Sequence, residues 1–323
     1  MPYYDRSTGL VVFGILTIAM GCLCALLVPL MFVGVALSAG TPGGQIPMSS
    51  LIPGACMYAF LAVALIWLGI GSIRARRWAR ALLLILSWTW LGIGLIAVIM
   101  MAFLLPTMLA NMPLPTVRAG QPQVRQAALE IGMAIGFLID GVILVVVPAI
   151  WTFFYSSRHV RFTCEWRDPL PCWTDTCPLP VLGLCLWLLF SAVMMLILPL
   201  TMHGVMPFFG MFITGFPSVI FCLANAALWV FAAGLLYQLD SRGWWLILVV
   251  FSLYMISSLL TFARHDIIEL YRLMDYPQAQ IDQIQKLGMF KGNFMIWMMV
   301  AFMLPILGYL LFIKKYFRRN PVG

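Results

Sequence analysis

The chain has 323 residues, of which 63% are hydrophobic and only 9% are charged, and its formal net charge is +8 at pH 7. A soluble domain carries about 25% charged residues on average, so this composition excludes a soluble globular fold, which would expose large apolar patches. The positive charge is typical of a membrane protein with Lys and Arg in its cytoplasmic loops, and we expect no nucleic acid as a partner.

Eight apolar runs, separated by polar or Pro- and Gly-rich breaks, predict eight transmembrane helices. A helix needs about 20 apolar residues to cross the hydrocarbon core of a bilayer. The predicted spans are residues 10–37, 54–73, 81–104, 127–153, 180–202, 213–236, 244–263 and 294–313. The first run is too long for the apolar core of a signal peptide, so we expect it to be retained. The predicted fold class is all-α, a polytopic transmembrane helical bundle.

The two halves of the chain share a pattern that predicts an internal duplication. Five matches occur in the same order in each half, and the first two pair Pro29 with Pro199 and Pro53 with Pro217. We therefore predict two tandem four-helix transmembrane units joined by a cytoplasmic linker. The first unit is residues 1–158, the linker 159–179 and the second unit 180–323. Because four spans begin and end on the same side of a membrane, both units are expected in parallel orientation.

The distribution of Lys and Arg predicts the orientation in the membrane. Thirteen of these residues fall on the side of the N-terminus and six on the other side. Basic loops are retained in the cytoplasm, so we expect a multi-pass protein of the inner (cytoplasmic) membrane with both termini cytoplasmic. The turn 76–80 (Arg-Arg-Trp-Ala-Arg) and the segment 164–169 (Cys-Glu-Trp-Arg-Asp-Pro) resemble segments of bacterial membrane proteins of unknown activity. The resemblance implies a bacterial membrane and no particular family.

A basic cluster with one tryptophan follows the second span, formed by Arg74, Arg76, Arg77, Trp78 and Arg80. Positive charge keeps a loop in the cytoplasm, and tryptophan favours the boundary between membrane and water. We expect the cluster to anchor this end of the bundle and to attract anionic lipid headgroups.

Two polar residues in the predicted spans are candidates for function. Asp140 lies near the middle of the fourth span, where an ionisable side chain is costly and marks a candidate site. It could carry a proton or bind a cation, or it could be a protonated carboxyl that hydrogen-bonds a neighbouring helix. His203, near the outer end of the fifth span, is either a site residue or an ordinary polar residue at the interface. Gly132 and Gly136 form a pair of small residues that predicts close helix packing along the fourth span.

The linker contains four residues that could bind zinc: His159, Cys164, Cys172 and Cys177. Four such ligands can complete a tetrahedron. Their spacing is irregular, however, and no Cys-x-x-Cys pair is present. An ordered connector without metal is the interpretation we favour, and no cofactor is expected.

The outer segment 264–292 predicts two short amphipathic helices. In the first of them Ile267, Leu270, Tyr271 and Met274 share one apolar face, with polar residues on the other. Such a segment could lie in the membrane interface, cap the bundle or present its apolar face to a partner.

No motif in the chain identifies a reaction. We find no phosphate-binding loop, no His-Glu-x-x-His helix, no Gly-x-Ser-x-Gly elbow and no histidine pair suited to haem. Three classes of function remain, and a non-enzymatic accessory, scaffold or partner-binding membrane component is the one we favour. The alternatives are a small-solute or proton-coupled transporter that uses Asp140, and a membrane-embedded enzyme acting on lipid. The expected partners are the lipid bilayer and either another protein or a second copy of the chain.

Overall fold

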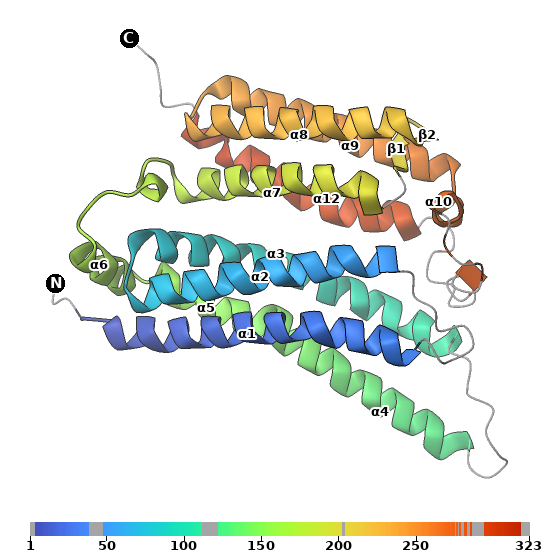
Figure 1. Cartoon of the computed structure of the whole chain (residues 1–323), viewed down its shortest axis with the longest axis horizontal. Coiled ribbons are helices and arrows are strands. Elements are labelled where there is room, and N and C mark those ends of the chain that lie inside the picture. Colours follow the sequence, from blue (N-terminus) through green and yellow to red (C-terminus); the bar gives the residue numbers. More distant parts are fainter. Residues whose placement is uncertain are drawn as a thin grey trace.

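The computed structural model describes residues 4–38, 48–111, 122–201, 204–274, 276, 278, 281–282, 285 and 294–317. All eight predicted spans are helices (Figure 1), and each is long and apolar enough to cross a membrane. The spans of the first half are α1 (Ser7–Ser38), α2 (Met48–Ile73), α3 (Arg77–Asn111) and a fourth made of α4 (Pro122–Gly141), η1 (Val142–Val146) and α5 (Val147–Ser156). Those of the second half are α7 (Leu179–Thr201), α8 (Phe216–Tyr237), α9 (Ser241–Arg264) and α12 (Phe294–Ile313). The chain is therefore a multi-pass integral membrane protein, and the predicted fold class is confirmed.

The spans lie side by side along the long axis of the molecule, and the start of α1 and the end of α12 lie at the same end of the bundle (Figure 1). In the first half α1 packs on α2, α2 on α3 and α3 on α5. In the second half α7 packs on α8, α8 on α9 and α9 on α12. The halves meet where α2 and α3 contact α7. The order of packing is the same in both halves, while the duplication itself stays a prediction.

Small residues allow α1 and α2 to approach closely. A Cβ on Gly14 would lie 2.8 Å from the carbonyl oxygen of Gly69, and a Cβ on Gly69 would lie 2.7 Å from that of Gly14. Lipid tails are as apolar as leucine, so helices in a membrane associate through close packing of this kind. In the second half, a polar contact contributes as well, because the buried Trp244 Nε1 donates a hydrogen bond of 2.7 Å to Leu310 O.

The fourth span contains an irregular turn that the sequence did not predict. In η1 the helix widens to a π-turn, where Val147 N donates to Val142 O, five residues back. Pro148 has no N–H, so the carbonyl of Leu144 lacks its usual helical donor. The Cα of Gly94 packs directly on this carbonyl, since a Cβ there would lie only 2.0 Å from Leu144 O. The absence of a side chain at Gly94 thus allows α3 to pack directly on the irregular turn.

Two segments differ from the prediction. The sixth span was expected from residue 213, but the helix begins at Phe216, and the residues before it form a short hairpin of β1 (Met206–Phe208) and β2 (Met211–Ile213). The hairpin turns at Gly210, whose φ of +89° favours glycine. The predicted linker is ordered and contains a helix, α6 (Arg158–Arg167), and a 3-10 turn, η2 (Trp173–Asp175).

Candidate functional site

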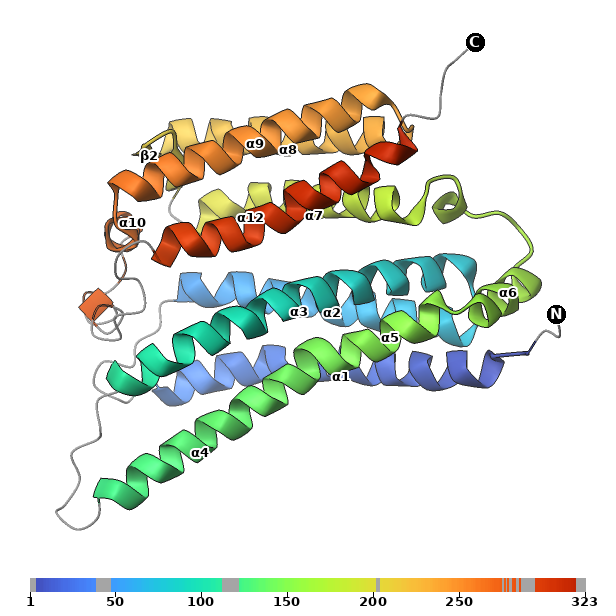
Figure 2. The same ribbon diagram turned by 180° about the vertical axis from the view of Figure 1, so that it is seen from behind.

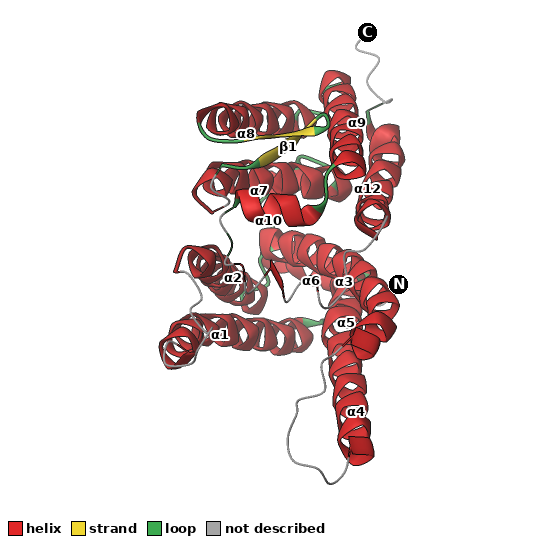
Figure 3. Cartoon of the chain, turned by 90° about the vertical axis from the view of Figure 1, so that its right-hand side faces the viewer, coloured by secondary structure: helices red, strands yellow, loops and turns green. Residues whose placement is uncertain are grey.

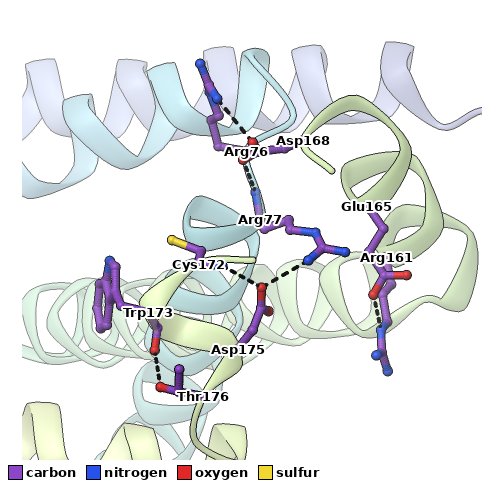
Figure 4. A network of polar contacts seen from close by, with 9 residues as sticks. All are labelled: Arg76, Arg77, Arg161, Glu165, Asp168, Cys172, Trp173, Asp175 and Thr176. Carbon is purple, nitrogen blue, oxygen red and sulfur yellow. Dashed lines mark hydrogen bonds and ion pairs between the residues drawn. The ribbon is translucent and has the colours of Figure 1, made fainter. Parts of the chain in front are cut away.

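The basic turn between α2 and α3 is tied to the linker by carboxylates. Arg76 Nη1 donates to Asp168 Oδ1 at 3.2 Å, and the backbone N of Arg77 donates to Asp168 Oδ2 at 3.3 Å. Arg77 Nη1 donates to Asp175 Oδ2, also at 3.2 Å (Figure 4). One carboxylate thus fixes the start of α3, and a second holds η2 against it.

The linker is also joined to the second half of the chain. Tyr237, at the end of α8, donates a hydrogen bond from its hydroxyl to Trp173 O at 2.9 Å, and the same hydroxyl lies 2.6 Å from Thr176 Oγ1. Within η2, Cys172 N donates to Asp175 Oδ2 at 3.1 Å. The linker therefore forms hydrogen bonds with both halves of the chain.

A cavity of about 380 Å³ lies where the turn, the linker and the second half meet. Its lining comes from α3, from α6, from the stretch around η2, from the start of α7 and from η3 (Lys314–Tyr316). The lining residues are Arg77, Arg80, Ala81, Arg161, Cys164, Glu165, Thr174, Asp175, Cys177, Pro178, Leu179, Pro180 and Tyr316. Three arginines face two carboxylates here, which leaves an excess of one positive charge.

The cations of the cavity differ in their partners. Arg77 is paired with Asp175 at 3.2 Å, and Arg161 Nε is paired with Glu165 Oε1 at 2.7 Å. Arg80 forms no ion pair with any described residue, and its Nε is buried without a hydrogen-bond partner. It is the one arginine of the lining whose charge is not neutralised by a direct contact.

The five residues of the basic cluster have different surroundings. Trp78 stacks on Trp67 of α2, with ring centroids 4.2 Å apart. Arg74 is exposed at the end of α2, whereas Arg76 and Arg77 are held by the linker and Arg80 lines the cavity. Binding of lipid headgroups by the cluster stays a prediction.

The four candidate zinc ligands are not brought together. Among the residues that the structure describes, no three His, Cys, Asp or Glu side chains are grouped so as to hold a metal ion. His159 packs edge-on against the ring of Tyr4, and the thiols of Cys164, Cys172 and Cys177 are free. Burial raises the pKa of Cys164 and of Cys177 to about 11, so both thiols are protonated at neutral pH.

Asp140 lies in the last turn of α4, and its side chain is half-buried. Among residues 131–141 of α4, the half-buried positions are 133, 136, 137, 140 and 141, and α4 contacts α3 in the bundle. The carboxyl forms no hydrogen bond or ion pair with any part of the chain that the structure describes. The other intramembrane candidate, His203, lies outside the described residues.

The two glycines on the same side of α4 have no neighbours within the described chain. A Cβ added to Gly132 or to Gly136 would meet nothing within 4 Å. Residues 132, 136 and 140 are four apart, so the glycines and Asp140 lie along one side of the helix. The close packing predicted for this glycine pair is not formed inside the described part of the molecule.

The predicted apolar face of the outer segment is partly covered by the protein itself. Helix α10 (Ile267–Leu273) crosses the end of the bundle (Figure 3), with Ile267, Leu270 and Tyr271 half-buried and Met274 buried. His265, just before the helix, lies 2.8 Å from Glu269 Oε2 through Nδ1 and 3.1 Å from Gly210 O through Nε2. Capping of the bundle and a face offered to a partner both stay predictions.

Several cavity residues, among them Arg161 and Thr174, were not singled out from the sequence. Arg161 was counted only among the cytoplasmic charges, and Thr174 carries no local signal, because a lone threonine in a linker is unremarkable.

Comparison with protein-family models, with curated proteins and with solved structures finds no match for this chain.

Proposed function

We propose that this protein is a non-enzymatic membrane component that binds a partner membrane protein along the fourth span. The observation that carries the proposal is a polar side chain without a partner: Asp140, within a transmembrane helix, has no hydrogen bond or ion pair among the described residues. Ionisable groups inside a membrane pair with one another or with backbone carbonyls because an unpaired one is costly. A partner helix would supply the missing contact.

The path of α4 leaves this side of the helix only partly covered. Followed from η1 back to its first residue, α4 moves away from α1 and α3. Its beginning lies at the end of the bundle opposite the start of α1 (Figures 1 and 2). Asp140 lies close to the point of divergence, and Gly136 and Gly132 follow along the departing helix. A stripe of small residues permits close approach of a second helix, and a polar residue beside it provides a specific hydrogen bond.

We expect this contact to lie inside the bilayer. The fourth candidate span runs from Ile131 to Ser156, so Asp140 lies nine residues from its outer end. At about 1.5 Å per residue this is roughly 14 Å, near the middle of a hydrocarbon core of about 30 Å. The partner therefore needs a transmembrane segment, and a soluble protein could not reach the site.

The chemistry of Asp140 favours a different protein over a second copy of this chain. A carboxylate needs a hydrogen-bond donor or a cation, such as Lys, Arg, His, Asn or Gln on the facing helix. Two copies meeting through this stripe would bring two carboxyl groups together, and like charges at close range oppose ionisation. Transport through Asp140, the alternative, has less support, since Asp140 does not line the arginine-rich cavity.

Site-specific photo-crosslinking in intact membranes tests the proposal. A photo-reactive amino acid at position 136 should give an adduct with one other membrane protein, and the same group at position 138 should not. Leu138 lies on the opposite side of α4 and is 67% exposed, so it faces lipid.

Two variants and a control sharpen the result. Asp140→Leu should reduce the yield of an adduct formed from position 132 by about threefold to twentyfold, the range for one hydrogen bond between membrane helices. Gly136→Ile should reduce it as well, because a branched side chain blocks the close approach. Leu138→Ala should leave it unchanged. An adduct that Asp140→Leu does not weaken, an adduct between two copies of this chain, or no protein adduct at all would refute the proposal.

A further inference from the structure

We propose that the cavity beside Arg80 binds a phosphate group, either that of a lipid headgroup or that of a free phosphate ester. The proposal is independent of the partner contact at Asp140, which lies in a different part of the fold. It rests on three features: an unneutralised arginine, a buried hydroxyl without a partner, and carboxylates that are already occupied.

Arg80 supplies the first feature. Its Nε is buried without a partner, and no described carboxylate forms an ion pair with it. Nε of Arg77, one helical turn earlier in α3, is also buried and unpartnered. A buried N–H group without a hydrogen-bond partner is destabilising. Two oxygens of a phosphate can accept from two nitrogens of one guanidinium group, and this fork geometry suits arginine better than lysine.

Thr174 supplies a second and independent feature. The residue is only 2% exposed, it lines the cavity, and its Oγ1 has no hydrogen-bond partner among the described residues. A buried hydroxyl normally finds a partner, and one that lacks it calls for an explanation. As a neutral donor it complements the arginines, because a phosphate has oxygens enough for both.

The two carboxylates of the lining do not remove the excess positive charge. Asp175 is held by Arg77, and Glu165 by Arg161. Both carboxylates also attract the charge of Arg80 without forming an ion pair with it. The three arginines of the lining still outnumber the two carboxylates by one. An anion is therefore favoured over a metal cation, and the cavity has room for it: about 380 Å³ is roughly a dozen times the volume of one water molecule.

The cavity lies where a lipid headgroup could enter it as well as a free phosphate ester. It lies at the Arg-rich end of the bundle, where the headgroups of a bilayer would be, and apolar side chains such as Leu179 line it beside the charges. Its walls come from α3 in the first half, from the linker, and from α7 and η3 in the second half. A bound phosphate would therefore tie the two halves together.

Ligand-dependent thermal stability of the full-length protein tests the proposal. The protein is purified in a non-ionic detergent, stripped of lipid, in a buffer free of phosphate. The probes are inorganic phosphate against chloride at matched ionic strength, and dioctanoyl phosphatidic acid against dioctanoylglycerol, which lacks the phosphate. We expect saturable stabilisation by at least one phosphate-containing probe and none by its control. Stabilisation by phosphatidic acid alone identifies a lipid, and stabilisation by inorganic phosphate as well identifies a free phosphate ester.

Three variants separate the site from general surface charge. Arg80→Gln should weaken the apparent affinity by about tenfold or more, and Thr174→Val, which keeps the shape of the side chain, by about threefold to tenfold. Thr174→Val also covers the case in which Arg80→Gln does not fold. Arg158→Gln removes an exposed arginine of α6 that does not line the cavity, and should bind as the unchanged protein does. No phosphate-dependent stabilisation, unchanged affinity in Thr174→Val, or equal loss in Arg158→Gln would overturn the proposal.

Discussion

Replacing Gly94 by alanine should destabilise the protein, although alanine is ordinarily the better helix residue. The added Cβ would lie 2.0 Å from Leu144 O, whereas real Cβ atoms stay at least 3.0 Å from such neighbours. The atoms must therefore separate by about 1 Å. The obstacle is a backbone carbonyl, so no side-chain rotation relieves the contact, and either α3 or η1 has to move.

The expected magnitude follows from comparison with Gly92, two residues earlier in the same helix. A Cβ on Gly92 meets nothing within 4 Å. Gly92→Ala should thus raise the free energy of unfolding by roughly 0.5–1 kcal/mol, the usual gain of alanine over glycine in a helix. Gly94→Ala shares this gain but adds an overpacking cost of about 1–3 kcal/mol, and a backbone clash belongs at the upper end. The two variants should differ by about 3 kcal/mol.

Reversible unfolding of the full-length protein in mixed micelles measures this difference. The fraction of denaturing detergent is increased, and the helical signal is followed by circular dichroism for the unchanged protein and for both variants. Gly94→Ala should unfold first and Gly92→Ala last. If the two variants unfold together, the close contact between α3 and the carbonyl of Leu144 does not exist in the folded protein.

Three further predictions concern the polar contacts. Ser72→Ala removes a hydroxyl that donates to Leu10 O in α1 and lies 2.7 Å from Tyr155 Oη. The variant should lower the free energy of unfolding by about 1–3 kcal/mol in the same assay. The double variant with Tyr155→Phe should lose less than the sum of the two single losses. Arg76→Gln removes an exposed ion pair and should change stability by less than about 1 kcal/mol, so a larger loss would contradict the geometry. In variants that keep a single cysteine, maleimide at pH 8 should label the half-exposed Cys172 and spare the buried Cys164. Burial raises the pKa of Cys164 to about 11, so its thiol stays protonated at pH 8. Rapid labelling of Cys164 at pH 8 would refute its burial.

Much of the fold could be predicted from the sequence, because the bilayer imposes a simple rule on it. Backbone groups in lipid must be paired within the segment, so each apolar run of sufficient length has to be a helix. The eight runs, the breaks between them and the even number of crossings follow from this rule, and the start of α1 and the end of α12 lie at one end of the bundle as it requires. The hairpin before α8 was missed because Met206–Ile213 is as apolar as the helix that follows.

The packing of the spans could not be predicted in the same way. A soluble helix shows its buried face as an apolar stripe, whereas a membrane helix is apolar on every side and gives no such signal. Nothing local to Gly94 and Gly92 distinguishes them, yet one touches a carbonyl and the other faces open space. The π-turn that provides this carbonyl depends on both Pro148 and the neighbouring helix.

The sequence by itself determined that this protein crosses the membrane eight times, because hydropathy and length are properties of each segment alone. It also singled out Asp140 as a costly residue, since an acid in an apolar run is visible without any neighbours. Only the tertiary structure decided which polar groups meet: Arg80 and Thr174 are 94 positions apart and line one cavity, while Asp140 meets no described partner. Contacts between distant segments depend on how helices pack, and in lipid that packing follows from shape and small residues rather than from hydrophobicity.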